Sequence, residues 1–254
     1  MTTIDELHPH PRTGLDREAL AELYGRPGAA GASRDGGPWV RVNFVSTLDG
    51  SATGGDGRSG TISSPADKMV FGVLRRLADV VLVAAGTVRR EGYDGPLVGP
   101  KQREWRLAHG LAEHPGLAIA TRRLDLDPAS ALFRDSPVRP LLLTVASAPA
   151  DARAALAEVA EIVDCGEDEI DAAQLRTILA DRAWTDVLCE GGPSFLGALT
   201  AADAVDELCL TLEPRLVAGT GPRIARGEAA DAPMRLGHVL RGERGELVLR
   251  YVRA

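Results

Sequence analysis

The end of one predicted strand carries residues suited to binding phosphate groups. Residues Thr185 to Glu190 form an apolar, strand-like run that leads directly into Gly191-Gly192-Pro193-Ser194, and the following FLGALTAA is typical of a helix. Backbone N–H groups at a helix start carry partial positive charge, and glycines leave room for a phosphate to reach them. The segment predicts a pyrophosphate site. A glycine turn that only satisfies the connection geometry is the alternative interpretation.

A second strand end has the same pattern. Residues Asp79 to Ala85 predict a strand, and Gly86-Thr87-Val88 follows as a step into a helix. The carboxyl ends of neighbouring parallel strands open onto one crevice, where open α/β sheets bind their ligands. The two steps together therefore favour a single nucleotide site.

Two carboxylates could act beside such a nucleotide. Glu190 stands directly before the glycines, where it could accept a hydrogen bond from a substrate N–H or relay a proton. Asp49 follows the first core strand in the segment STLDG, residues 46–50, between an apolar residue and a turn glycine. Capping that turn is the structural alternative for Asp49.

Other catalytic motifs lack support. The Gly-x-Gly-x-x-Gly pattern of residues 55–60 is far from the preceding strand and the following helix, so we interpret it as a mobile loop rather than a dinucleotide fingerprint. The sequence has no Walker lysine motif, no His-Glu-x-x-His and no Gly-x-Ser-x-Gly. Cys165, Cys189 and Cys209 are far apart and lack Cys-x-x-Cys spacing, so we expect buried thiols and no metal site.

Composition narrows the class of protein. The 254 residues are 44% hydrophobic and 26% charged, which is typical of a globular protein. Twenty-nine basic and 36 acidic residues give a net charge of −7, which disfavours nucleic acid as a partner. The sequence shows no secretory leader and no apolar run long enough to cross a bilayer. We therefore expect a soluble, cytoplasmic protein that does not bind membranes.

The predicted elements alternate in a way that positions these strand ends. Short apolar runs rich in β-branched residues begin at Trp39, and helices stand between several of them, the clearest running from Ser64 to about Ala78. The segments 205–217 and 245–254 read as longer alternating strands, so we expect antiparallel pairing at one edge. The pattern predicts a three-layer α/β fold with a mostly parallel central sheet. Residues 205–217 form either an internal strand or an intersubunit sheet edge.

The first 38 residues differ in character from the rest of the chain. Residues 25–38 are rich in Gly, Ala, Pro and charge, which predicts a flexible connection, and the helix-like Gly14 to Tyr24 then becomes an appendage. We therefore expect residues 1–38 to be an N-terminal extension and linker, and residues 39–254 to form the folded domain.

Four segments in order resemble the C-terminal reductase domain of the bacterial riboflavin-biosynthesis deaminase/reductase, a relative of dihydrofolate reductase. They are STLDG (46–50), LRRLADVVLVAAGTV (74–88), EGGPSFLGAL (190–199) and VDELCLTLEPRLVAG (205–219). The similarity runs from about Pro38 to the end of the chain. It implies a dihydrofolate reductase-like fold, NADPH as hydride donor, a ribosylaminopyrimidine phosphate as substrate and a homodimer.

The resemblance also implies roles for individual residues. Ser59 and Arg75 match substrate-side positions, where Arg75 could hold a ribityl phosphate by a bidentate ion pair. Glu190 would address the pyrimidine, and Asp49 would lie near the nicotinamide as a proton relay or as an electrostatic stabiliser. With the strand-end residues added, the cofactor site comprises Ser46, Thr61, Gly86, Thr87, Glu91, Thr121, Arg122, Gly191, Gly192, Pro193, Ser194, Phe195 and Leu196.

Charge and placement extend this site. Arg122 and Arg123 follow directly after a predicted strand, so they are candidate partners for the 2′-phosphate of NADP. The implied reaction reduces a 5-amino-6-(5-phosphoribosylamino)uracil-type substrate by hydride transfer to ribose C1′, as in riboflavin biosynthesis.

The sequence also departs from the family pattern. The deaminase half commonly fused to this reductase has no counterpart here, so we expect a stand-alone reductase domain. The turn after Thr87, TVRREGYDGP, is bulkier and more basic than the family's Asp-rich turn, which keeps other substrates open. The alternatives are a dihydrofolate reductase-like activity on a pterin and an NADP-binding module without turnover.

Overall fold

The computed structural model describes residues 2–25 and 36–254, and ten strands within these ranges form one mixed sheet. The strand order is β1-β9-β10-β8-β2-β7-β3-β4-β5-β6. The strands are β1 (Ile4–His8), β2 (Trp39–Thr47), β3 (Val80–Ala84), β4 (Gly116–Ala120), β5 (Leu141–Thr144), β6 (Glu161–Asp164), β7 (Asp186–Cys189), β8 (Glu207–Glu213), β9 (Met234–Gly242) and β10 (Leu247–Arg253). Neighbouring strands in the part of the sheet from β8 to β6 all pair in parallel. Neighbouring strands in the part from β1 to β8 pair antiparallel. The predicted α/β fold with a mostly parallel sheet is confirmed.

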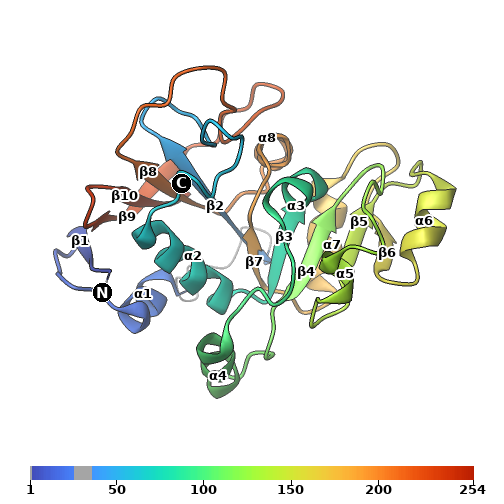
Figure 1. Ribbon diagram of the computed structural model, residues 1–254, viewed down its shortest axis with the longest axis horizontal. Helices are drawn as coiled ribbons and strands as arrows, with labels where there is room; N and C mark the ends of the chain where they lie inside the picture. The colour runs from blue at the N-terminus through green and yellow to red at the C-terminus, as the bar shows by residue number, and fades with distance from the viewer. Residues whose placement is uncertain (1, 26–35) are drawn as a thin grey trace.

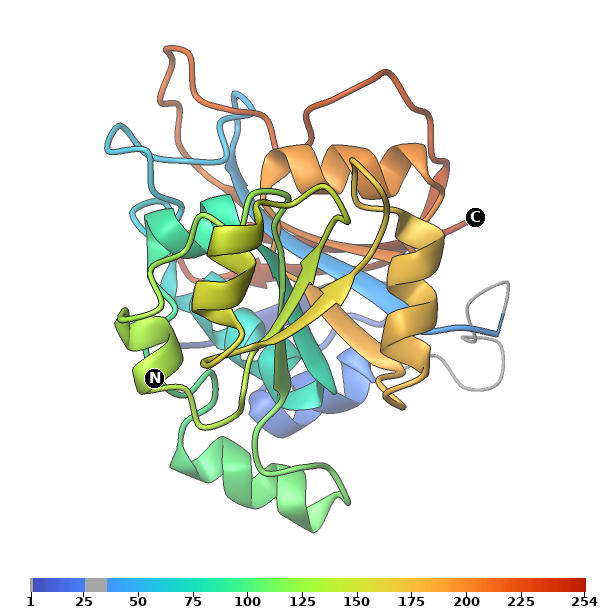
Figure 2. The ribbon, with the colours of Figure 1, turned by 90° about the vertical axis from the view of Figure 1, so that its right-hand side faces the viewer.

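Helices cover both faces of this sheet and make the expected three layers. They are α1 (Arg17–Tyr24), α2 (Pro65–Leu77), α3 (Ala85–Glu91), α4 (Pro100–Ala108), α5 (Ala131–Arg134), α6 (Ala150–Leu156), α7 (Ala172–Ala180) and α8 (Pro193–Ala201). Figure 2 shows α7 and α8 on one side of the sheet and α1 and α2 on the other. In this arrangement the carboxyl ends of β3 and β7 point toward the space between α2, α3 and α8 (Figure 1).

The alternation of side chains along the strands builds a separate core on each face. In β3, Val81 and Val83 belong to the core beneath α1 and α2, whereas Val80 and Leu82 belong to the core beneath α7 and α8. Successive side chains of a strand point to opposite faces, so a strand buried on both faces reads as one continuous apolar run. The apolar runs that predicted β2, β3, β4, β5 and β7 have this physical origin, whereas edge strand β6 has no fully buried residue.

Helix α2 begins where the sequence indicates. The Ser64 side chain accepts a hydrogen bond from the Asp67 backbone N–H, and Pro65 occupies the first helical position, where no N–H is needed. Its buried face includes Val70, Val73 and Leu74. This packing fixes the other faces of α2, including the one that reaches the site described below.

The N-terminal segment differs from the predicted extension. Residues Ile4–His8 form edge strand β1 paired with β9, and α1 packs against α2 with Leu20 and Tyr24 fully buried. Figure 1 shows this blue segment beside the red C-terminal strands. Gly14 to Tyr24 is therefore part of the folded unit and no appendage. Most of the expected flexible linker, residues 26–35, lies outside the described residues.

A buried ionic cluster connects α1 to the sheet. Arg41 of β2 donates from Nε to Glu207 Oε1 at 2.7 Å and from Nη2 to the Tyr24 carbonyl oxygen at 2.6 Å, and Arg250 Nη2 donates to Glu207 Oε2 at 3.0 Å. Burial alone would raise the pKa of Glu207, but the charges of Arg41 and Arg250 outweigh it and hold the pKa at about 2. The Tyr24 ring meets His238 edge-on at 4.6 Å between ring centroids.

His238 makes the stability of this region dependent on pH. Burial, with the nearby charge of Arg250, lowers the pKa of His238 from 6.5 to about 3. Below pH 6.5 the histidine of the unfolded chain takes up a proton, whereas the buried His238 of the folded chain stays neutral down to about pH 3. The free energy of unfolding is therefore highest above pH 6.5 and falls as the pH drops toward 3. We expect unfolding free energy to fall between pH 7 and pH 5 by about 2 kcal/mol more in wild type than in His238→Phe, measured by urea unfolding. Equal losses in both proteins would contradict this assignment.

Strand β8 is internal. It pairs in parallel with β2 and antiparallel with β10, so its backbone is bonded on both sides. Of the two interpretations of residues 205–217, the internal strand is therefore correct for Glu207–Glu213. Among the helices of residues 2–25 and 36–254, none has the length and apolar character required to cross a membrane.

Candidate active site

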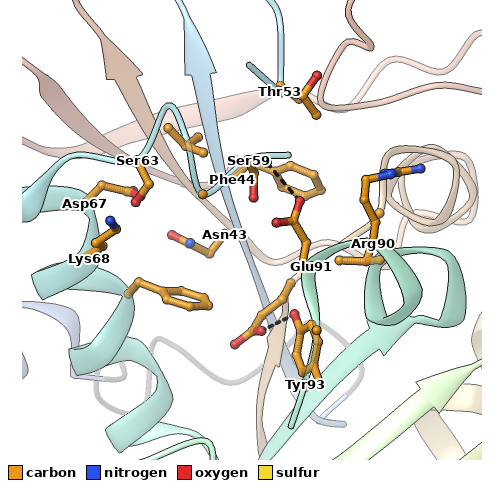
Figure 3. Close-up of a pocket in the computed structure, with 18 of the residues that line it drawn as sticks. Asn43, Phe44, Thr53, Ser59, Ser63, Asp67, Lys68, Arg90, Glu91 and Tyr93 are labelled. Atoms are coloured by element: carbon orange, nitrogen blue, oxygen red, sulfur yellow. Dashed lines mark hydrogen bonds between the residues drawn. The ribbon is translucent and has the colours of Figure 1, made fainter. Parts of the chain in front are cut away.

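A cavity of about 340 Å³, here called the α2 cavity, opens beside β2 at the level of α2 and α3. Its lining comes from β2, α2, α3, the start of α8 and the segments that follow β2, α3 and β7. The lining includes Asn43 and Phe44 of β2, Ser59 of the loop after β2, Glu91 of α3, and Glu190. Figure 3 shows the Asn43 amide directed into the space between α2 and Glu91. The cavity is large enough for a single-ring ligand with polar substituents.

Helix α2 contributes a continuous wall. Asp67, Phe71 and Arg75 line the cavity at spacings of four residues, so they lie on one face of the helix, and Lys68 stands beside them. The wall has a carboxylate and an ammonium group at one end, an aromatic ring in the middle and a guanidinium group at the other end.

The guanidinium end is closed by an ion pair that the sequence analysis did not expect. Arg75 donates from Nε and Nη2 to the two carboxylate oxygens of Glu190, both at 2.7 Å, and the Tyr93 hydroxyl donates to Glu190 Oε2 at 2.6 Å. Burial, reinforced by the Glu190 charge, raises the pKa of Tyr93 well above 10, so this phenol remains a donor. The guanidinium carbon of Arg75 also lies 4.3 Å from the Phe71 ring centroid.

This pairing gives Arg75 a partner that the sequence analysis did not anticipate. The bidentate partner of its guanidinium is Glu190, so the fork predicted to hold a ribityl phosphate is already engaged. Burial would lower the pKa of Arg75, but the adjacent carboxylate more than offsets this and raises it. The Glu190 oxygens accept two hydrogen bonds from Arg75 and one from Tyr93. Glu190 is therefore held in place as a hydrogen-bond acceptor rather than a mobile proton carrier.

A second cavity of about 400 Å³, here called the α8 cavity, lies at the ends of β3 and β4 and the start of α8. It adjoins the α2 cavity, because Thr87, Arg90, Gly192 and Pro193 line both. A Cβ atom built on Gly192 would lie 2.7 Å from Thr87 Oγ1. The two strand-end steps identified in the sequence thus face each other at the junction of the two cavities.

The start of α8 leaves backbone N–H groups uncapped. Gly192 is the N-cap residue and no side chain bonds to the first turn. The N–H groups of Ser194 and Phe195 belong to that turn, so they have no partner within the helix. Both residues line the α8 cavity, which therefore presents an electropositive helix end to a ligand.

Four arginines surround the α8 cavity, and two of them are already paired. Arg89 donates to Asp125 Oδ1 at 2.7 Å, and Arg122 forms an ion pair with Glu169. Within residues 2–25 and 36–254, neither Arg90 nor Arg123 makes an ion pair or side-chain hydrogen bond, and both are exposed. Of the two arginines expected at a 2′-phosphate, Arg123 is the one whose charge is uncompensated.

The structure brings most of the predicted cofactor residues together and separates the rest. Those that line the α8 cavity are Gly86, Thr87, Thr121, Arg122, Gly192, Pro193, Ser194 and Phe195. Those that line neither cavity are Ser46, Thr61, Gly191 and Leu196. Ser46 and Leu196 are buried, Gly191 packs against Phe44, and the Thr61 hydroxyl donates to Asp56 Oδ1 at 2.9 Å.

Glu91 and Ser59 meet at the α2 cavity. The Ser59 backbone N–H donates to Glu91 Oε1 at 2.9 Å, which ties the glycine-rich loop to the end of α3. The expected cofactor residue Glu91 therefore lies beside the expected substrate residue Ser59, and both line the α2 cavity.

The expected catalytic residue Asp49 lies outside both cavities. It is exposed and lines neither cavity. Its Oδ1 accepts from the Thr47 hydroxyl, and its Oδ2 accepts from the backbone N–H groups of Val217 at 3.1 Å and Ala218 at 2.6 Å. The Thr47 bond and the Ala218 N–H bond lower the pKa of Asp49. The Thr47 bond lies within the turn that Asp49 was expected to cap as its structural alternative, and the bonds to Val217 and Ala218 connect that turn to a second loop.

We expect Asp49→Ala to weaken the loop contact without removing a reacting group. Turnover should stay within about twofold of wild type, as for surface substitutions that leave reacting groups in place, and thermal unfolding should begin earlier. Steady-state kinetics and a thermal melt measure the two effects. A large fall in turnover with an unchanged melt would restore Asp49 as a catalytic residue.

Several lining residues escaped the sequence analysis. Asp67 and Phe71 could have been found, because their four-residue spacing with Arg75 defines one helix face. Asn43 and Tyr93 carried no such signal, since each became a lining residue only through the packing of β2 and of the turn after α3.

Comparison with known protein families gives one match over most of the chain. The model of the family described as the RibD C-terminal domain matches residues 38–247. The 2,5-diamino-6-ribosylamino-4(3H)-pyrimidinone 5′-phosphate reductase of Archaeoglobus fulgidus is 25% identical over 193 residues, which are 76% of this chain and 88% of that protein. The riboflavin biosynthesis protein RibD of Mycobacterium tuberculosis is 30% identical over 187 residues, which are 73% of this chain but 45% of RibD.

Solved structures support the same fold. A pyrimidine reductase-like protein from Corynebacterium diphtheriae superposes with a TM-score of 0.78 at 24% identity, covering 85% of this chain and 92% of the other. The Saccharomyces cerevisiae riboflavin biosynthesis reductase Rib7 superposes with a TM-score of 0.67 at 18% identity, covering 94% and 100%. The fold implied by the sequence resemblance is confirmed.

Proposed function

This chain belongs to the RibD C-terminal domain family, and from that membership we propose that it reduces a ribosylaminopyrimidine phosphate with NADPH in the two joined cavities. The main support for this proposal is the junction between the α2 cavity and the α8 cavity. Thr87 and Gly192 line both cavities, so a ligand held at the start of α8 can extend into the α2 cavity. A two-part cavity of this kind suits a dinucleotide in one half and its reaction partner in the other.

The residues of the α8 cavity fit the cofactor. A Cβ on residue 192 would fill the space beside the backbone. Because Gly192 has none, a phosphate can approach the backbone N–H groups closely. We assign the pyrophosphate to the N–H groups of Ser194 and Phe195, and the 2′-phosphate to Arg123 with Arg122. The unpaired charge of Arg123 supports a preference for NADPH over NADH. When bound, the nicotinamide supplies the hydride for C1′ of the ring-opened imine.

The residues of the α2 cavity bind and orient the other reactant. The fixed Glu190 carboxylate serves as an acceptor for a substrate N–H or hydroxyl, and Arg75 and Tyr93 hold it in place. Oε1 of Glu190 accepts only one hydrogen bond from the described residues, so it retains capacity for a ligand. The phenyl rings of Phe44 and Phe71 help to exclude water from the cavity.

Two other functions use the same cavities. A dihydrofolate reductase-like activity would place a pterin in the α2 cavity, and an NADP-binding module would leave it without a reacting partner. The Glu190 carboxylate and the polar residues of α2 that line the cavity favour an enzyme, because a module that only binds NADP needs neither. We further propose that the enzyme is a cytoplasmic homodimer. Sedimentation of the purified chain tests the dimer.

Oxidation of NADPH, followed by its absorbance, tests these proposals. The reactants are 5-amino-6-(5-phosphoribosylamino)uracil, its undeaminated 2,5-diaminopyrimidinone counterpart, and dihydrofolate, each with NADPH and with NADH. We expect turnover with at least one of the two ribosylaminopyrimidine phosphates and a preference for NADPH. Turnover with dihydrofolate alone would favour the pterin alternative. NADPH binding without any turnover would favour the binding module.

A further inference from the structure

Asp67 is a buried carboxylate in the α2 cavity that the reaction described above does not use. It belongs to the first turn of α2, is only 6% exposed, and lines the cavity. Its Oδ2 accepts from the Ser63 hydroxyl at 2.5 Å and its Oδ1 from the Thr211 hydroxyl at 2.6 Å. Figure 3 shows Asp67 and Lys68 on α2, with Ser63 of the preceding loop beside Asp67.

The two hydroxyls hold this carboxylate in place but leave part of its hydrogen-bonding capacity free. Each carboxylate oxygen has two lone-pair sites, and each accepts only one hydrogen bond from a side chain of the described residues. A buried carboxylate is costly unless donors surround it. The remaining sites therefore favour a ligand that brings N–H donors into the cavity.

Lys68 adds the opposite kind of group next to Asp67. It is exposed and lines the cavity, and within residues 2–25 and 36–254 its ammonium makes no ion pair or side-chain hydrogen bond. The first turn of α2 thus presents acceptors on Asp67 beside a donor on Lys68. A ligand edge that matches it carries donors followed by an acceptor.

Two ring types that differ by one substituent meet this wall differently. A 2-amino-4(3H)-pyrimidinone has an amino group, a ring N–H and a carbonyl oxygen along one edge. A carboxylate can accept from the first two while an ammonium donates to the third. A uracil has a carbonyl oxygen in place of the amino group. That oxygen would face the Asp67 carboxylate with no proton between them, which is unfavourable in a buried site.

We propose that Asp67 selects the 2-amino form of the pyrimidine, so that this enzyme acts on the ring before deamination. The proposal rests on the proposed function and names its substrate more closely. It differs from the uracil-type substrate that the sequence resemblance implied. The carboxylate reads the amino group and ring N–H, and Lys68 binds the adjacent carbonyl oxygen.

The first test measures binding without catalysis. Titration calorimetry compares 2,5,6-triamino-4(3H)-pyrimidinone with 5,6-diaminouracil, in which a carbonyl oxygen replaces the 2-amino group. We expect wild type to bind the amino compound on the order of 10- to 100-fold more tightly, the range for a hydrogen bond to a charged group. Equal affinities, or tighter binding of the uracil, would overturn the proposal even if the protein reduces both phosphates.

Substitution separates a selecting role from a structural one. Asp67→Asn keeps the shape but replaces one acceptor by a donor, so the preference for the amino compound should disappear. Glu213→Gln is the matched control. Glu213 is the last residue of β8, is also buried, accepts a hydrogen bond from the Ser64 backbone N–H at 2.9 Å beside the start of α2, and does not line the cavity. It should keep the wild-type preference. Loss of preference in both variants would assign Asp67 a structural role only.

Kinetics with the two ribosylaminopyrimidine phosphates complete the test. We expect the ratio of kcat/KM, amino form over uracil form, to fall by about 10- to 100-fold in Asp67→Asn and to stay unchanged in Glu213→Gln. Lys68→Met should weaken both substrates alike, because both carry the carbonyl oxygen. If wild type reduces neither phosphate, the proposed function fails, while the calorimetric comparison still decides the binding preference of Asp67.

Discussion

Gly192→Val is expected to abolish useful NADPH binding while leaving the protein folded. The backbone at Gly192 has φ −90° and ψ −168°, extended dihedral angles that any residue can adopt. A Cβ there would already lie 2.7 Å from Thr87 Oγ1, and the two methyl groups of valine would fill the junction shared by both cavities. We expect affinity for NADPH to fall at least about 100-fold, measured by fluorescence titration.

Gly55→Val provides the matched control. Gly55 lies in the exposed glycine-rich loop, and a Cβ built on it would meet no atom within 4 Å. This variant should bind NADPH as wild type does. A folded Gly192→Val protein with wild-type affinity would show that the cofactor does not use the start of α8.

Glu190→Gln is expected to lower stability and activity together. The substitution removes the negative charge opposite the Arg75 guanidinium, whose side chain is 19% exposed, and leaves that cation without its bidentate partner. Breaking a largely buried ion pair in this way costs about 3 kcal/mol. Urea unfolding should show this loss. Turnover should fall as well, because the fixed acceptor of the α2 cavity is replaced by a neutral amide.

Two further variants isolate the ion pair. Tyr93→Phe removes one hydroxyl donor to Glu190 and should cost about 1 kcal/mol. The double variant Arg75→Met, Glu190→Gln removes both charges, so it should be more stable than Glu190→Gln alone. A loss below about 1 kcal/mol in Glu190→Gln would show that the pair contributes little and that Arg75 is free to bind a ligand.

The sequence was informative wherever one residue type answers a local physical need. Strands β2 and β3 are buried on both faces, so they appeared as continuous apolar runs, and Ser64 with Pro65 marked the start of α2. The glycine steps at Gly86 and Gly192 were found because backbone N–H groups can reach a ligand only where side chains are absent.

The sequence was less informative where packing between distant segments decides the outcome. Asp49 has neighbours typical of a turn, and only the fold brings Val217 and Ala218 to its carboxylate. Arg75 and Glu190 are far apart in sequence, so their ion pair could not be read from spacing. The segment around Ile4 looked like an extension because an edge strand pairs on one side only, and its partner β9 lies near the other end of the chain.

The position of NADP⁺ in a crystal structure of its complex with this protein tests the central claim most directly. The account predicts the pyrophosphate at the N–H groups of Ser194 and Phe195, and the nicotinamide ring at the junction between Thr87 and Gly192, facing the α2 cavity. A nicotinamide ring directed away from the α2 cavity, or a cofactor bound elsewhere on the protein, would contradict it.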